Sequence, residues 1–248
     1  MTIISRFGLC GLARAPHRFV LPLLVAVLAL GSGAARATPV FSYTATVEGT
    51  ANPSAGLTVT NYTPPGTGTG SIGFGDGTVA TFANPSASAY PAMAVNGSLA
   101  GLYAAPVDAG GSAIATNYYS TGLGTVTFQL ASPQSYFGLL WGSADIGNTL
   151  AFYSGGTLVG AITTADFDAA ANGSQGFGGS YFINANLSGG AFDEVIASSS
   201  FNSFEFGDVV AGAAPASVPE PASAALLAAG LLGCAVLRRR APALSRAV

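Results

Sequence analysis

The chain has 248 residues, of which half are hydrophobic and 8% are charged, and this composition excludes a charged disordered chain. It contains 34 glycines but no Gly-x-y period, which excludes a collagen. It has no lysine, and its eight arginines all lie in the first 36 or the last 11 positions. All eleven acidic residues therefore lie in a stretch of the sequence that contains no lysine or arginine. A nucleic-acid-binding surface needs lysine or arginine to neutralise phosphates, so a nucleic-acid partner is excluded.

The first 37 residues have the three parts of a secretory signal peptide. Three arginines lie in the first 18 positions, and residues 19–30 form a short apolar stretch that we expect to be a signal helix. Ala35 and Ala37 are the small side chains that signal peptidase reads, so we expect cleavage before Thr38. The alternative is an N-terminal membrane anchor that is retained.

Residues 38–211 are dominated by alternation of apolar and polar side chains, which is typical of half-buried strands. In residues 125–130, for example, Val126, Phe128 and Leu130 share one face. Further strands are predicted at 41–47, 71–74, 78–82, 135–141, 149–153, 158–163, 181–185, 192–197 and 202–206. Many short strands without alternating helices predict an all-β fold, an antiparallel and jelly-roll-like β-sandwich.

Two local features punctuate these strands. Ser154, Gly155 and Gly156 predict a hairpin turn. Residues 164–171 predict one short helix with Thr164 as its N-cap.

One segment of the body, residues 136–153, carries a W-G-S-x-D pattern that includes Trp141 and Asp145. It resembles the strand-turn-strand core of a group of exosortase-dependent surface proteins, and residues 192–195 and 204–209 resemble the closing strands of that group. The resemblance implies a β-sandwich related in shape to carbohydrate-binding modules, with no activity attached. Trp141 and Tyr153 are candidate glycan contacts if exposed, whereas a tryptophan in an apolar strand more often belongs to the core.

The body lacks the residues of most active sites and metal sites. His17, Cys10 and Cys234 all lie outside it, which excludes nucleophile–histidine pairs and zinc or copper sites there. We therefore expect no catalytic residues and no enzyme activity. An acid-only glycosidase remains as an alternative, with the candidate carboxylates Glu48, Asp145, Asp193, Glu194, Glu205 and Asp208.

No cofactor is expected, with Ca²⁺ as the one exception to consider, because it needs only oxygen ligands. Asp166 and Asp168 are weak candidate ligands, since the segment lacks an EF-hand pattern, and a helix start or turn is the favoured interpretation. A body with eleven acids and no base would also gain from divalent cations that offset carboxylate repulsion.

The C-terminal region has the organisation of a membrane-directed sorting signal. A linker at 212–217 precedes the tail 218–248, in which an apolar run at 222–237 is followed by three arginines, Arg238, Arg239 and Arg240. The run predicts a transmembrane helix whose arginines stay in the cytoplasm by the positive-inside rule. A plain C-terminal membrane anchor is the alternative.

With Val218, Pro219, Glu220 and Pro221 ahead of the apolar run, this tail resembles the PEP-CTERM sorting signal of Gram-negative bacteria. The resemblance implies processing by an exosortase, after an inner-membrane intermediate, and delivery to the cell surface or extracellular matrix. For the body we expect a structural or interaction role. A carbohydrate-binding module that contacts extracellular polysaccharide is the alternative.

Overall fold

The computed structural model describes residues 38–47, 57–85, 88–108, 110–170 and 178–213. The chain divides into two units, residues 1–37 and 38–248, at the predicted signal-peptide junction. The predicted signal helix, the transmembrane helix at 222–237, and every sorting-signal residue from Val218 to Arg240 lie outside the described residues. Within the described ranges, no helix has the length and apolar character needed to cross a membrane.

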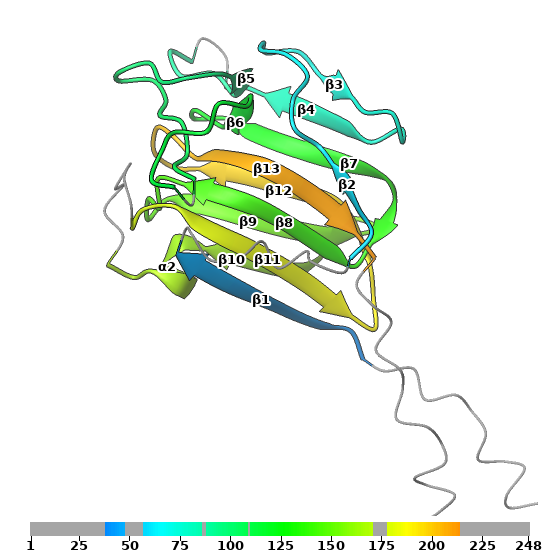
Figure 1. Ribbon diagram of the computed structural model, residues 1–248. Helices are drawn as coiled ribbons and strands as arrows, with labels where there is room; N and C mark the ends of the chain where they lie inside the picture. Colours follow the sequence, from blue (N-terminus) through cyan, green and yellow to red (C-terminus); the bar gives the residue numbers. More distant parts are fainter. Residues whose placement is uncertain (1–37, 48–56, 86–87, 109, 171–177, 214–248) are drawn as a thin grey trace, which may run out of the picture. The chain divides into compact units, whose positions relative to one another are not determined.

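The described part of the chain folds into two antiparallel sheets (Figure 1). The seven-stranded sheet has the order β1 (Val40–Val47), β11 (Tyr181–Ser188), β8 (Tyr136–Gly142), β13 (Glu205–Gly212), β6 (Tyr118–Ser120) and β5 (Met93–Val95), and β2 (Val59–Asn61) also pairs with β13. The six-stranded sheet has the order β10 (Thr157–Thr163), β9 (Asn148–Ser154), β12 (Phe192–Ser199), β7 (Thr125–Gln134), β4 (Val79–Ala83) and β3 (Ile72–Gly73). The predicted all-β, antiparallel architecture is confirmed.

The strand order of the central eight strands is that of a jelly roll. Along the chain β6 to β13 cross repeatedly between the sheets, so that one sheet contains β11-β8-β13-β6 and the other β10-β9-β12-β7. Strands β1, β5, β4 and β3 extend the edges of the two sheets. The topology therefore agrees with the predicted jelly-roll-like sandwich.

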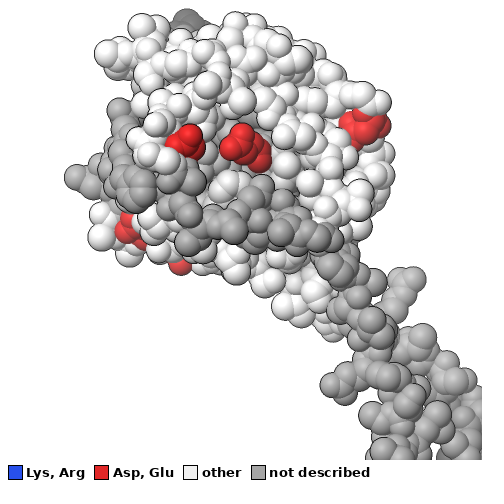
Figure 2. Space-filling view, in the orientation of Figure 1, with Lys and Arg blue, Asp and Glu red and all other residues white. Residues whose placement is uncertain are grey.

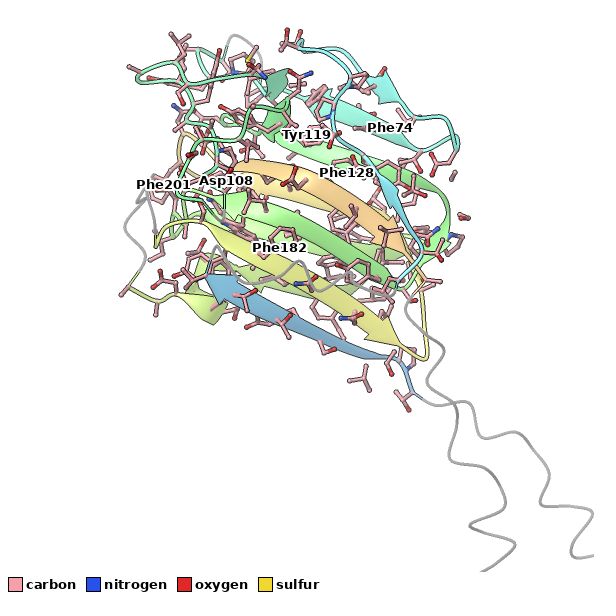
Figure 3. The ribbon with its side chains drawn as sticks, viewed as in Figure 1. Phe74, Asp108, Tyr119, Phe128, Phe182 and Phe201 are labelled. Carbon is pink, nitrogen blue, oxygen red and sulfur yellow. The ribbon has the colours of Figure 1, made fainter. Side chains whose placement is uncertain are left out.

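A layer of aromatic side chains fills the space between the sheets. Phe128 of β7 packs against Phe137 of β8, with 5.7 Å between ring centroids, and against Tyr119 of β6 at 5.1 Å. Figure 3 shows Tyr119 and Phe128 in this layer. Because inward residues alternate with outward ones along each strand, the period-2 pattern of the sequence translates directly into this core.

The predicted hairpin turn is confirmed, whereas the predicted helix differs from the observed one. Gly155 and Gly156 join β9 to β10 with φ of 53° and 77°, a left-handed conformation that glycine adopts without strain. Helix α2 covers only Thr164–Phe167, and its N-cap is Thr163 rather than Thr164. The reason lies in Asp166, whose Oδ2 accepts hydrogen bonds from the Thr163 N–H and hydroxyl at 2.7 and 2.8 Å.

Most observed strands lie within two residues of the predicted bounds, whereas β7 and β11 extend four and three residues beyond them. Three strands of three residues each, β2, β5 and β6, were not expected, because so short a run shows no period. Strand β13 runs from Glu205 to Gly212, so only the last two residues of the predicted strand 202–206 belong to it, and it also takes the first residue of the predicted linker.

Candidate functional site

The segment between β5 and β6 packs on the seven-stranded sheet; its described residues, 96–108 and 110–117, are here called the covering segment. Its Ala105 and Ile114 form a second small core with Leu140 of β8, on the opposite side of that strand from the inter-sheet layer. Gly142 at the end of β8 allows close approach, because a Cβ there would lie 2.8 Å from the Pro106 ring. The covering segment thereby buries one end of the sheet.

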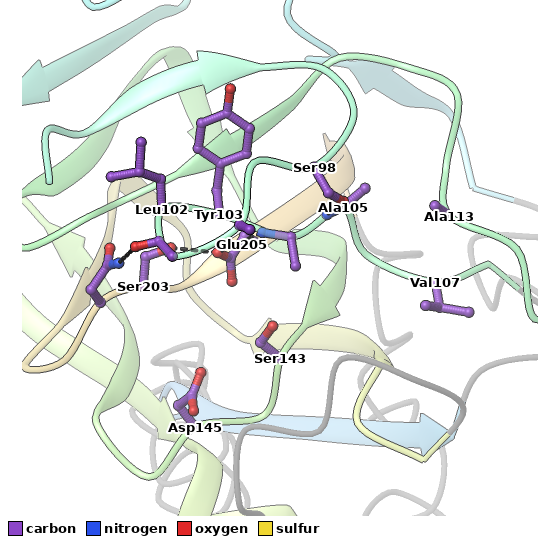
Figure 4. A pocket seen from close by; sticks show the side chains of 14 residues that line it. Ser98, Leu102, Tyr103, Ala105, Val107, Ala113, Ser143, Asp145, Ser203 and Glu205 are labelled. Atoms are coloured by element: carbon purple, nitrogen blue, oxygen red, sulfur yellow. Dashed lines mark hydrogen bonds between the residues drawn. The ribbon is translucent and has the colours of Figure 1, made fainter.

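A hollow of about 570 Å³ lies beneath the covering segment, where β8 ends and β13 begins (Figure 4). The covering segment supplies one wall, including Ser98, Leu102 and Tyr103. The opposite wall consists of polar side chains from the ends of the two strands: Ser143, Asp145, Asn202, Ser203 and Glu205. In Figure 4 the Glu205 carboxyl, the Ser143 hydroxyl and the Asp145 carboxyl face the same space.

Glu205 is the most deeply buried acid of this hollow, at 2% exposure. Its Oε1 accepts hydrogen bonds from the Ser203 hydroxyl at 2.5 Å and from the Ala104 N–H at 3.2 Å. Since Ser203 donates to the carboxylate, its oxygen is the acceptor for Ser120 at 3.0 Å. The other carboxylate oxygen, Oε2, has no hydrogen-bond partner.

This environment raises the pKa of Glu205 to about 7. Burial is the largest cause, because it disfavours the charged form, and the nearby Asp145 adds repulsion. The Ser203 hydroxyl, the Ala104 N–H and the Ser143 hydroxyl oppose the rise without cancelling it. The Ser143 hydroxyl therefore lies close enough to the carboxylate to lower its pKa, although it does not complete a hydrogen bond of normal geometry to Oε2. Glu205 therefore titrates close to neutral pH.

Asp145 is held by a tightly bonded turn, residues 143–148. The Asn148 side chain donates to the Ser143 carbonyl at 2.9 Å and accepts from the Ser199 hydroxyl at 2.7 Å. The Thr164 hydroxyl donates to the Asp145 carbonyl at 2.5 Å. Ser143 has φ of 46°, a conformation uncommon outside glycine, which these bonds maintain. Half-burial raises the pKa of Asp145.

Of the five acids considered for carboxylate chemistry that the structure describes, two are brought together. Asp145 and Glu205 line the same hollow. Asp193 instead accepts from the Gly155 N–H at 3.1 Å, and Glu194 accepts from the Gln129 amide, so these neighbours are engaged on different partners. Asp208 lies on a bulge of β13, and the sixth candidate, Glu48, lies outside the described residues.

The two candidate glycan contacts lie away from the hollow. Trp141 is fully buried, with its ring 4.2 Å from Phe204 and 5.2 Å from Phe167 between centroids. The indole is thus enclosed by the protein core, and no sugar can stack on it. Tyr153 is half-buried on β9, in the other sheet.

The weak calcium candidates Asp166 and Asp168 are engaged in local bonds, as a helix-start and turn pair would be. Asp166 binds Thr163 at the start of α2. Asp168 accepts from the Ala170 N–H at 3.1 Å and from the Tyr181 hydroxyl at 2.8 Å. Among the described residues, no group of three or more His, Cys, Asp or Glu is placed to hold a metal ion.

No positive side chain balances the acids of the sandwich. The described ranges contain no Lys, Arg or His, and Figure 2 accordingly shows acidic side chains on the surface and no basic ones. A ligand of the hollow would therefore meet no positive side chain, and its polar partners would be carboxylates, hydroxyls, the Asn202 amide and backbone groups.

Sequence reasoning identified Asp145 and Glu205 as acids but missed the site that joins them. The alternation of Phe204, Glu205 and Phe206 placed the carboxylate opposite two aromatics, which the structure confirms. No sequence pattern marked Ser143 or Ser203 as a residue of a site. The covering segment has no period from which its position could be read.

Comparisons with known proteins match only the C-terminal region. The family model of the PEP-CTERM protein-sorting motif matches residues 217–240. No curated protein and no solved structure matches the chain. The motif implies that the protein is exported, processed by exosortase and sorted to the cell surface. The chain is thus a β-sandwich that carries a PEP-CTERM protein-sorting motif.

Proposed function

We propose that the mature protein is a non-catalytic component of the cell surface or extracellular matrix, with a structural or interaction role performed by the β-sandwich. The observation that carries this proposal is the sorting motif at residues 217–240, directly after the last strand of a folded body. Signal peptidase removes residues 1–37, and the run at 222–237 holds an inner-membrane intermediate until exosortase acts. The arrangement suits a Gram-negative host.

A role without catalysis is supported by the chemistry of the hollow. Asp145 and Glu205 are two carboxylates in one cavity, the minimum for glycoside hydrolysis. The other groups that usually hold a sugar in such a site are few here, because Tyr103 is the only aromatic among the described lining residues and no basic residue lies in the described ranges. The lining residues of the hollow therefore suit binding of a ligand better than hydrolysis of a glycoside.

Carbohydrate binding is the second candidate role. The hollow offers hydroxyl and carboxylate acceptors for sugar hydroxyls, and Phe201, next to the lining residue Asn202, is 56% exposed. Ligand sites commonly combine aromatic side chains with a few well-placed polar groups. Affinity electrophoresis through gels of host polysaccharide tests this role, and unretarded migration in all of them removes it.

Substitution of the motif tests the sorting itself. We expect Glu220→Ala combined with Pro219→Ala to remove most of the protein from the cell surface and leave an uncleaved form in the membrane fraction. The physical reason is that the processing enzyme loses its recognition residues while the apolar run remains. Surface biotinylation and immunoblotting of cell fractions measure both effects.

The matched control is Pro215→Ala, which removes a proline from the same linker but lies outside the matched residues. It is expected to reach the surface like the wild type. If the double variant were displayed at the wild-type level, the proposal that the motif sorts this chain would be wrong.

A further inference from the structure

The starting observation is a carboxylate oxygen that the protein itself leaves without a partner. Glu205 is 2% exposed and lines the hollow, and its Oε2 accepts no hydrogen bond, whereas Oε1 accepts two. A buried polar atom without a partner costs free energy, and such atoms are rare in folded proteins. An occupant of the hollow that binds Oε2 would remove this cost.

The second observation concerns charge. The Asp145 carboxylate faces the same hollow, and no hydrogen bond to it forms within the described residues. Two carboxylates that face one cavity repel each other, and the sandwich has no Lys, Arg or His in its described ranges to balance them. A cationic occupant of the hollow would supply the missing positive charge.

The third observation is that the Glu205 side chain and the backbone turn that carries Asp145 are both held by hydrogen bonds. Ser203 and Ala104 fix the Glu205 side chain, and the bonds from Asn148 and Thr164 fix the turn that carries Asp145. Rigid ligands lose little conformational entropy when a cation binds between them. The Glu205 carboxylate and the backbone that carries Asp145 are therefore in place before a cation binds.

We propose that the hollow is a Ca²⁺ site, in which the cation binds the carboxylates of Glu205 and Asp145. The Ser143 hydroxyl and water complete the coordination, for which a cavity of about 570 Å³ leaves ample room. Only oxygen donors are present, which selects hard cations, and the partly hydrated, irregular geometry suits Ca²⁺ better than Mg²⁺. This inference goes beyond the proposed surface role and does not depend on it.

The number of carboxylates sets the expected strength. Two acidic ligands are fewer than a high-affinity site has, so the Kd should fall in the range of extracellular modules, on the order of 10⁻⁴ to 10⁻³ M. A cation that binds only the folded state raises the unfolding temperature by mass action. At 10 mM Ca²⁺, or about ten to a hundred times that Kd, the rise should be on the order of 5 °C for a domain of this size.

The experiment is thermal unfolding of the full-length chain in mild detergent, stripped of cations and then titrated with CaCl₂ or MgCl₂. The wild type is expected to show a saturable rise in unfolding temperature with Ca²⁺ and a clearly smaller one with Mg²⁺. Glu205→Gln and Asp145→Asn should each lose the Ca²⁺-dependent rise. Asp145→Asn serves as the second variant because its side chain makes no described hydrogen bond on which folding depends.

The matched control is Asp193→Asn, which removes the same charge from β12 in the other sheet. This variant is expected to keep the full Ca²⁺ response. If the wild type shows no response, or if both hollow variants respond as strongly as Asp193→Asn, Ca²⁺ acts through general screening or not at all, and the site does not exist. Failure of surface sorting leaves this result unchanged, so the two proposals fail separately.

Discussion

Replacing Trp141 with alanine is expected to lower the free energy of unfolding by about 3–5 kcal/mol, the usual cost of removing a large buried aromatic. The side chain is 0% exposed and packs between Phe204 and Phe167. Its removal leaves a cavity at the point where β8 and β13 lie side by side. Because Ser143, two residues further on, lines the hollow, the geometry of the hollow should loosen as well.

Trp141→Phe is the matched control. The indole N–H is buried without a hydrogen-bond partner, so its removal relieves a desolvation cost of about 1–3 kcal/mol while most of the ring volume remains. We therefore expect phenylalanine to cost much less than alanine. Urea unfolding followed by far-ultraviolet circular dichroism measures both variants, since Trp141 is the only tryptophan and its fluorescence is lost. A loss below 1 kcal/mol for alanine would contradict the packing described here.

Glu205→Gln is expected to stabilise the cation-free protein at pH 8 by about 3 kcal/mol, because it removes an acid that must ionise while buried. The pKa of Glu205 is about 7 in the folded state, against an ordinary value of 4.5 for a glutamate side chain. The folded protein thus binds more protons than the unfolded chain between these two values. In wild type, the stability should fall as pH rises from 4.5 to 7 and then remain level.

Other acids also contribute to the pH dependence of stability, but they are the same in wild type and in Glu205→Gln, so the comparison between the two proteins is unaffected. Burial also raises the pKa of Asp145 and of Asp208, the latter with a contribution from Asp108, and both effects have the same sign. Asp76 has a lowered pKa: burial alone would raise it, but hydrogen bonds from Thr78 and Tyr62 outweigh burial. Its contribution is lost as pH falls below 3.8, outside the window of Glu205.

The measurement is urea unfolding of wild type and Glu205→Gln in EDTA across pH 5 to 8. The difference between the two proteins should be small near pH 5 and should grow as the pH rises. An equal difference at every pH would show that Glu205 does not titrate in this range, and the description of its environment would then be wrong.

The long strands could be predicted because burial on one face imposes a period of two on their sequences. Residues 125–130 illustrate this, since Val126 and Phe128 are fully buried where alternation placed them. The three-residue strands β2, β5 and β6 are determined by partners far away in the chain, such as β13 for β2 and β6. Local sequence contains too little information to predict such pairings.

The candidate site could be predicted only in part, for the same reason. The alternation around Glu205 showed which face it occupies, but its burial depends on the covering segment, whose Ala104 lies 101 residues earlier in the chain. Trp141 and Asp145 attracted attention through the W-G-S-x-D pattern, yet their roles differ: one completes the core and the other faces the hollow. Backbone curvature at Ser143 separates them, and no pattern of residue types predicts it.

The central claim is that this chain is exported and then trimmed at both ends, so that the sandwich alone reaches its destination. Intact-mass spectrometry of the protein purified from its native host tests it most directly. We predict a mature chain that begins at Thr38 and lacks the apolar run at 222–237 with the arginines that follow. A mass that corresponds to all 248 residues would contradict the claim.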